Sequence, residues 1–497
     1  MLEFLCRQLA LVRWEWRIHW RDRTPWVAAV VMMLLSAAAI ANGWLRQSDW
    51  HRTIEELVAS ERSDDLFLRS AFGAETDVEL IAGHPLSLPE AGRARTLRLI
   101  AKLPTSLAYF GGTSHALQPP TRLASLSTAN FGRFPDRYLI TAHSRRSTLE
   151  RSDLTNPFSL STGPFDLAAL ITLIFPLIII GLNYDVISAE REQGRMGLTV
   201  AQGLKPSSFF LIRGVVRIIC PLTLLIISLI TVSLLSPSLL PAPDLAAQLI
   251  VACAAVAGYA LLWVALCLMV NALSGSSTGN AVGLACIWVV LVLVVPTAVA
   301  SLANHRFPSL PESQLVLRER ELRAELIPQG KELLSQWFDN HPELKRPDRA
   351  ADRYGQSRWD IISHHVDQRM DADIEFDLQQ AERRDRLVGQ LQVLSPALTF
   401  RRLLDDLAGV SEAQFTEFRR RTTEFHARFK GWFLPGMLTR AELSLSDLES
   451  RPQFQVRSPQ PESVSQTAVR ALTILLGWVV IPLGLAVFGM RRLSTAT

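Results

Sequence analysis

A short charged string between two apolar stretches has the residue types and spacing best suited to a specific interaction. It runs SAEREQGRMGLTVAQGLK from Ser188 to Lys205 and brings Glu190, Arg191, Glu192 and Gly194 close together. Such charges support recognition of another protein through ion pairs and hydrogen bonds. Two apolar helices can be joined by a tight turn, so this much patterned sequence predicts a docking element. A merely solvated membrane face is the alternative interpretation.

The sequence contains no catalytic motif in the structural context that the motif requires. A phosphate-cradling loop requires G-x-x-x-x-G-K-[ST], but the Gly330-Lys331 pair has Glu325 at the first glycine position and Glu332 at the last position. The string from Gly275 to Gly279 matches G-x-S-x-G, yet it falls in a short turn rather than between a strand and a helix. We therefore expect no catalytic residue, and no hydrolysis of ATP by this chain.

A metal site is not favoured either. His364 and His365 stand beside Asp360 and other carboxylates in one predicted helix. Neighbouring side chains on a helix point about 100° apart, so the two histidines cannot both ligate one ion. The sequence also lacks the H-E-x-x-H string of zinc proteases. We expect no metal and no cofactor on this chain.

The elements that position these residues follow from composition. The chain has 497 residues, 48% of them hydrophobic, and its 51 basic and 47 acidic residues are unevenly spread. Several stretches of about 20 residues are almost free of charge, which predicts an all-α integral membrane protein with six transmembrane helices. The net charge of +4 is too small to indicate a nucleic-acid partner. The predicted spans are residues 25–44, 166–187, 209–235, 245–270, 281–303 and 469–490.

The placement of arginine and lysine predicts the orientation. Basic residues gather in residues 1–24, 188–208 and 491–497, whereas the short connection between spans three and four has none. By the positive-inside rule, both termini are cytoplasmic. Residues 45–165 and 304–468 are then extracytoplasmic inserts, and neither contains a cysteine. External inserts without disulfides favour a bacterial inner membrane facing the periplasm.

Residues 1–24 have a helical pattern of their own. At about 100° per residue, one face and the opposite face differ sharply in polarity. The apolar face carries Leu5, Leu9, Val12, Trp16 and Trp20, and the polar face carries Arg7, Arg13, Arg17 and Arg21. The pattern predicts an interfacial helix that lies on anionic membrane lipid. The alternatives are a plain basic flank of the first span, or a signal peptide cut near Ala39-Ile40-Ala41.

Ionisable residues inside predicted spans are candidates for function because burying charge in lipid is costly. Arg213 and Arg217 lie on one face of the third span near its cytoplasmic end. We expect them to snorkel to the interface, with a span-interface or gating role as the alternative. Asp185, near the same end of the second span, can pair with either arginine. Asp166 and Arg470 are expected to be interfacial residues at the outer surface.

The two inserts differ in pattern. The second insert repeats apolar residues at helical spacing and predicts a helical bundle. Its predicted helices are Pro311 to Phe338, Ala351 to Leu394, Pro396 to Ala408 and Ser411 to Phe433. The first insert predicts helices from Asp49 to Ser70 and Gly92 to Lys102, and one strand from Arg137 to Ala142. We expect it to be a cap packed on the second insert, with a substrate-docking surface as the alternative.

The charged string resembles a known family. The E-R-E-x-G element at residues 190–194, followed by the span that carries Arg213 and Arg217, is similar to that of ABC exporter permeases of the type V fold. The residues ahead of it, from Asn156 to Pro176, resemble the subgroup with large extracytoplasmic inserts after spans one and five. That subgroup includes the permease for copper-centre maturation of nitrous oxide reductase. Where the family usually continues with leucine, this chain has Arg195 to Thr199.

The resemblance implies that ATP acts on other chains. A permease of this family pairs with a second permease, identical or related, and each binds a subunit of a cytoplasmic ABC ATPase dimer. The resemblance implies that Glu190, Arg191, Glu192 and Gly194 are the ATPase-coupling residues. ATP and Mg would bind to the partner ATPase, and the movement would reach the spans through a contact that differs between two states.

Two functions are therefore expected from the sequence. The first is the transmembrane permease subunit of an ATP-driven ABC transporter, which couples a separate ATPase to export or to other work outside the membrane. The second is a scaffold that transmits movement to a periplasmic partner protein without passing a substrate, and the size of the inserts favours it. A membrane-embedded enzyme is disfavoured because no catalytic string stands in a suitable context.

Overall fold

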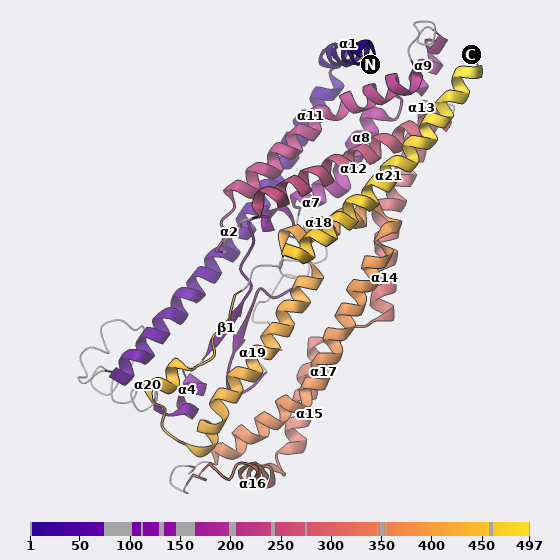
Figure 1. The fold of residues 1–497 in the computed structure, drawn as a ribbon. Helices are drawn as coiled ribbons and strands as arrows, with labels where there is room; N and C mark the ends of the chain where they lie inside the picture. Colours follow the sequence, from indigo (N-terminus) through magenta and orange to yellow (C-terminus); the bar gives the residue numbers. More distant parts are fainter. Residues whose placement is uncertain are drawn as a thin grey trace.

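The computed structural model describes residues 2–73, 102–110, 113–128, 134–145, 165–197, 205–239, 244–273, 276–344, 346–347, 352, 355–456 and 461–496. Over these residues the chain is an all-α membrane protein apart from one short β-hairpin. Six described helical segments are long and apolar enough to cross a membrane, and each overlaps one predicted span. The molecule is elongated with both termini at one end (Figure 1). We call this the terminal end, and the opposite end the insert end.

Four of the six spans are continuous helices. Helix α2 (Thr24–Gly73) forms the first span and runs on for 50 residues, so the helix predicted from Asp49 to Ser70 is its second half. Spans three, four and six are α11 (Pro206–Leu235), α12 (Leu245–Leu273) and α21 (Pro461–Ala496). The share of residues buried inside the protein is 56% for span four but 22% for span six. Span four therefore lies near the centre of the bundle.

Spans two and five are each interrupted by a π-helical segment. Span two consists of α7 (Leu167–Ala169), η2 (Leu170–Ile174) and α8 (Phe175–Asn183). Span five consists of α13 (Ser277–Trp288), η3 (Val289–Val294) and α14 (Val295–Arg306). In each span a proline, Pro176 or Pro296, is the second residue after the π segment. Proline has no backbone N–H to donate to the preceding turn, so one α-helical hydrogen bond is already missing there. The wider π-helical turn forms at this interruption.

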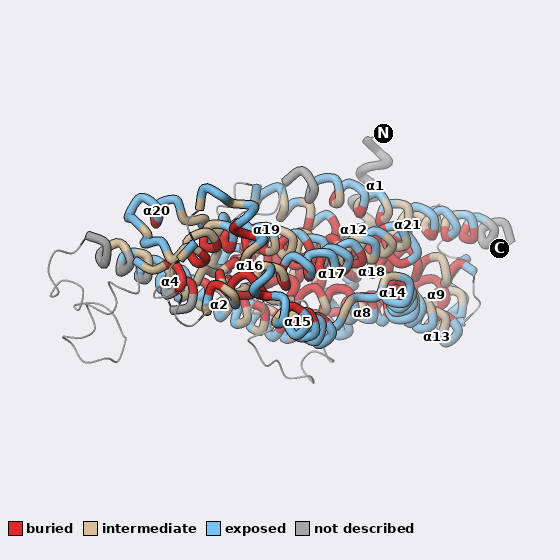
Figure 2. The backbone as a smooth tube through the Cα atoms, turned by 90° about the horizontal axis from the view of Figure 1, so that it is seen from below, coloured by how far each residue is buried: buried red, intermediate tan, exposed pale blue. Residues whose placement is uncertain are grey.

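Helix α1 (Leu2–Arg21) lies at the terminal end and crosses the long axis of the molecule (Figures 1 and 2). The chain turns sharply at Asp22, whose Oδ1 accepts a hydrogen bond from Thr24 N at 3.2 Å. The predicted helix is present, and the face that packs on α11 is not the apolar face assigned to the lipid. Glu15 is buried against α11 at 5% exposure, whereas Trp20 from the predicted apolar face is 50% exposed.

The second insert is helical throughout most of its described length. Its elements are α15 (Glu312–Leu326), α16 (Gly330–Asn340), α17 (Gln356–Leu391), η4 (Gln392–Leu394), α18 (Pro396–Ala408), α19 (Glu412–Thr439) and α20 (Leu445–Glu449). The single helix predicted from Pro311 to Phe338 is two helices. The break occurs before Gly330, where an added Cβ would lie 2.6 Å from Ile362 of α17. In the insert end, α17 and α19 run roughly along the direction of the spans (Figure 1).

The first insert packs on the second one. Its described elements are α4 (Pro104–Phe110), β1 (Ser114–Leu117), η1 (Ala124–Leu126) and β2 (Arg137–Ile140). Strands β1 and β2 pair antiparallel with Ser114 opposite Ile140, so the predicted strand is confirmed. Leu107 and Ile140 share one apolar cluster with Phe425, Phe429 and other α19 residues. The predicted contact between the inserts is therefore present, whereas the helix predicted from Gly92 to Lys102 falls almost wholly outside the described residues.

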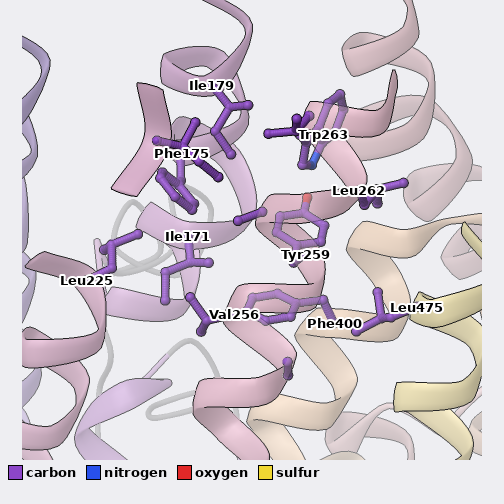
Figure 3. Close-up of a cluster of buried hydrophobic side chains, with 14 of the residues drawn as sticks. Ile171, Phe175, Ile179, Leu225, Val256, Tyr259, Leu262, Trp263, Phe400 and Leu475 are labelled. Carbon is purple, nitrogen blue, oxygen red and sulfur yellow. The ribbon is translucent and has the colours of Figure 1, made fainter. Parts of the chain in front are cut away.

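Helix α18 belongs to the core of the spans. Its Phe400, Leu403, Leu404 and Leu407 are buried in the same cluster as residues of spans two, three, four and six. Figure 3 shows the rings of Phe400 and Tyr259 face to face, and their centroids lie 4.7 Å apart at 12°. The sequence interpretation placed residues 396–408 in the second insert. The structure thus joins this part of the insert directly to span four.

The turn from α17 through η4 into α18 reaches the middle of two spans. Ser395 Oγ donates to the carbonyl of Leu291 at 2.5 Å, and Leu291 is at the midpoint of span five. Trp478, at the midpoint of span six, donates from Nε1 to the carbonyl of Val393 at 3.0 Å. Irregular backbone at such depth is tolerated where protein groups satisfy it. We call residues 392–395 the inserted turn.

Candidate functional site

The predicted coupling element forms a short helix at the terminal end. Helix α9 (Ser188–Glu192) follows a turn after span two and ends where Gly194 adopts a φ of +68°. That left-handed conformation is easy only for glycine, so Gly194 sets where the helix stops. Met196 returns into the span core as a buried residue. The amphipathic half of the predicted element, residues 198–204, lies outside the described residues.

Helix α9 is fastened to spans four and five through Asn271. Asn271 Oδ1 accepts from Ser188 N at 3.3 Å and from Asn280 Nδ2 at 3.0 Å. Arg191 donates to the carbonyl of Asn271 at 3.2 Å. Ser188 and Asn271 are fully buried, and each buried hydrogen bond removed would leave a partner without one. The start of α9 therefore cannot move without moving the adjoining ends of α12 and α13.

Glu192 attaches the other end of α9 to span five. Its Oε1 accepts from Ser277 N at 2.7 Å and its Oε2 accepts from Ser277 Oγ at 3.0 Å. Ser277 is the first residue of α13, whose N-cap residue is Ser276. A carboxylate at this position satisfies a free helical N–H and interacts favourably with the helix dipole.

Glu190 attaches α9 to α11 and, through Arg213, to α1. Arg213 of α11 contacts Glu190 Oε1 at 2.8 Å and Glu15 Oε1 at 2.8 Å. The side chains of Arg213, Glu15 and Glu190 are 12%, 7% and 11% exposed. Arg195 forms a second pair with Glu190, at 2.9 Å, on the exposed side. We call Glu15, Arg213 and Glu190 the inner charge triad.

The expectation that Arg213 snorkels to the interface was wrong, since its side chain is only 12% exposed, whereas the side chain of Arg217 remains 28% exposed. Arg213 turns inward because two carboxylates, one from α1 and one from α9, lie on its inner side. Arg217 donates to Asp185 Oδ1 at 3.1 Å and to the carbonyl of Leu182 at 2.7 Å. Asp185 thus pairs with one of the two arginines, as the sequence allowed. These pairs hold α11 against the end of span two.

Asp166, expected to be an interfacial residue, is instead fully buried at the insert-end terminus of span two. It caps α7 by accepting from Ala169 N at 2.7 Å, and it accepts from Thr128 N at 2.7 Å. Arg401 of α18 lies 3.5 Å from Asp166 and 3.2 Å from Asp405. The correction follows from α18, because its insertion between spans covers this terminus. Arg470 remains exposed and donates to the carbonyl of Gly389 at 2.8 Å.

Two residues of the site were missed at the sequence level. Glu15 was passed over because it falls outside both faces assigned to the first helix. Asn271 was passed over because it was placed in the turn after span four. A signal for each was present, since each is a polar residue at the edge of an apolar stretch. The part of the chain that the structure describes brings together no group of three or more His, Cys, Asp or Glu suited to a metal.

One family model matches part of the chain. It is described as a domain of unknown function (DUF3526) and it matches residues 313–457. This range is less than half of the chain, runs from α15 to just beyond α20, and includes the inserted turn and α18. No curated protein matches the chain. The similarity therefore concerns the helical second insert and does not include α9.

Proposed function

We propose that this chain is the transmembrane permease subunit of an ATP-driven ABC transporter, and that it couples a separate cytoplasmic ATPase to export or to other work outside the membrane. A second permease chain, identical or related, would complete the transmembrane part. ATP and Mg would bind to the ATPase dimer. The terminal end would face the cytoplasm of a bacterial cell.

The observation that carries this proposal is the attachment of α9. This helix is only five residues long, yet its side chains contact α11, α12 and α13. Through Arg213 of α11 it is also linked to Glu15 of α1. A surface helix with no mechanical role needs no such anchorage. A force applied to α9 would be distributed at once to three spans and to the first helix. Glu190 and Arg191 would serve as anchors, while the exposed Gln193 and Arg195 would offer the docking surface.

The test is ATPase association by the full-length chain. The tagged chain would be purified in detergent with the ATPase subunits it binds, and ATP hydrolysis by the complex would be measured. Glu192→Ala and Glu190→Ala should lower both association and hydrolysis, whereas Glu332→Ala, at an exposed position of α16, should change neither. The chain alone should not hydrolyse ATP. An unchanged complex with both α9 variants, or hydrolysis by the chain alone, would contradict the proposal.

A scaffold that transmits movement to a periplasmic partner is the second candidate, and α18 favours it. This helix is buried among the spans through Phe400 and Leu404. It is joined to the second insert at both ends, by η4 and by the short turn into α19. Movement of spans two and four would therefore be carried directly into the long helices of the insert end.

A cross-link separates the two candidates. A cysteine pair at positions 259 and 400, in a chain without other cysteines, would fix α18 to span four. In a scaffold, α18 moves together with the spans. The ATP-driven change in the signal of a spectroscopic label on α16 should therefore persist. An exporter that opens a path between α18 and the spans should be blocked. Loss of the α16 response would contradict the scaffold candidate.

A further inference from the structure

The outward face of α1 carries exposed arginines and tryptophans side by side. At 100° per residue, Arg13 and Arg17 lie about 160° to either side of Glu15, which faces α11. Trp20 lies about 140° and the exposed Arg21 about 120° away from Glu15. Arg13 and Arg17 are exposed and Trp20 is 50% exposed. Within the part of the chain that the structure describes, neither arginine has an ion-pair partner. The face opposite the inner charge triad is thus cationic and aromatic.

The same face is continuous with the start of span one. Trp26, in the first turn of α2, donates from Nε1 to the carbonyl of Trp20 at 3.3 Å. The rings of Trp20 and Trp26 meet edge to face at 4.5 Å, and Trp16 lies 5.8 Å from Trp20. Trp26 remains 44% exposed at the beginning of a membrane-crossing segment. Tryptophans in this position are typical of the boundary between lipid tails and headgroups, so α1 lies at headgroup depth.

We propose that Arg13, Arg17 and Arg21 on this face bind anionic phospholipid headgroups, and that this binding braces α9 through the inner charge triad. Guanidinium groups match the planar geometry of phosphate oxygens and remain charged at every relevant pH. Charge complementarity selects anionic over zwitterionic lipid, and the tryptophan cluster sets the depth at which the headgroup sits.

The brace follows from the two opposite faces of one helix. Glu15 holds Arg213 from the α1 side, and Glu190 holds it from the α9 side, each at 2.8 Å. All three side chains are nearly buried, so loss of Glu15 would leave Arg213 with only one internal carboxylate. Lipid that keeps α1 pressed against α11 therefore keeps Arg213 placed for Glu190. This inference holds whether or not α9 binds an ATPase.

The binding test uses the full-length chain in nanodiscs with spin-labelled lipids. Motionally restricted phosphatidylglycerol should exceed restricted phosphatidylcholine for the native chain. The triple variant Arg13→Gln, Arg17→Gln, Arg21→Gln should lower this preference at least fivefold, because fivefold corresponds to about 1 kcal/mol, the contribution of a single basic residue near a membrane. The matched lysine triple should keep the preference, and so should a triple at exposed positions of the second insert, Arg318→Gln, Arg346→Gln, Arg369→Gln.

The brace is tested by amide hydrogen exchange in α9. Exchange of residues 188–192 should be slower in discs containing phosphatidylglycerol than in phosphatidylcholine alone. The glutamine triple should abolish this difference, and Glu15→Gln should abolish it while keeping the lipid preference. A triple variant with undiminished preference for phosphatidylglycerol would overturn the binding proposal. Exchange in α9 that does not respond to lipid, or a response that survives Glu15→Gln, would overturn the brace.

Discussion

One buried and one partly buried histidine should make the insert end unstable in mild acid. His426 of α19 is 1% exposed, and burial lowers its pKa to about 3. Burial also lowers the pKa of His364 of α17, to about 4, with Lys430 as the next cause. Both imidazoles are therefore neutral in the folded protein at pH 7. Unfolding exposes them to water, where an ordinary histidine titrates near pH 6.5.

The sign and size of the effect follow from this difference. Because each folded-state pKa lies below the unfolded value, the stabilisation is complete above about pH 6.5 and is lost as pH falls. Each pH unit below 6.5 costs about 1.4 kcal/mol per histidine until the folded pKa is reached. Between pH 7 and pH 5 each histidine should cost about 2 kcal/mol, or about 4 kcal/mol for the pair.

A buried ion pair lies beside these histidines. Asp367 and Lys430 form a buried ion pair at 2.5 Å, both side chains being 6% exposed. Burial acts to raise the pKa of Asp367, but nearby positive charges, Lys430 first, hold it below the ordinary value. Burial lowers the pKa of Lys430, opposed by Asp367. Arg145 pairs with Asp371 at 2.5 Å on the same side.

The assay is urea unfolding of the full chain in nanodiscs at pH 5 and pH 7, with protease cleavage within α17 and α19 as the readout. His426→Phe should remove about half of the loss between the two pH values, because phenylalanine cannot take up a proton. His305→Phe, at an exposed position of α14, should leave the loss unchanged. A change below about 1 kcal/mol in the native chain, or no effect of His426→Phe, would refute the reasoning.

Three further predictions concern other contacts. Arg213→Met leaves Glu190 buried without its inner cation and should lower the free energy of unfolding by about 3–5 kcal/mol. Arg195→Met, at a 51% exposed side chain, should hardly change the thermal midpoint. Phe400→Ala empties a fully buried position and should cost about 3–5 kcal/mol in urea titrations. Burial raises the pKa of Asp406 to about 6, so Asp406→Asn should raise the thermal midpoint above pH 6, and the gain should vanish near pH 4.

The membrane spans could be predicted because lipid imposes one requirement along a whole segment. About 20 consecutive apolar residues are needed to cross, and composition alone reveals them. The same argument underestimated the first span, since α2 continues to Gly73 with polar residues that a hydropathy criterion excludes. It also gave no hint of the π segments, although Pro176 and Pro296 stand where the ladder breaks.

The partners of the charged residues could not be predicted, because they come from distant parts of the chain. Arg213 meets Glu15, which lies 198 residues away, and Arg401 meets Asp166, which lies 235 residues away. A local pattern assigns a residue to a face but does not say what will cover that face. Snorkelling was therefore the sensible expectation for an isolated span. That expectation fails for Arg213 because carboxylates from other helices lie close enough to pair with its guanidinium group.

The inserted turn and the π segment of span five are best understood as one arrangement. A π segment leaves backbone carbonyls of a span displaced from the regular ladder, and at mid-span no water is available to satisfy them. Ser395 fills this need at Leu291. The turn has the same problem at its own carbonyls, and Thr399 Oγ1 bonds Gln392 O at 2.7 Å while Trp478 bonds Val393 O. Each irregular segment thus depends on side chains from its surroundings. Separation of α18 from the spans would leave the carbonyls of the turn and of the π segment without their hydrogen bonds at the same time. We therefore expect α18 either to stay in one position against the spans or to separate from them in a single step.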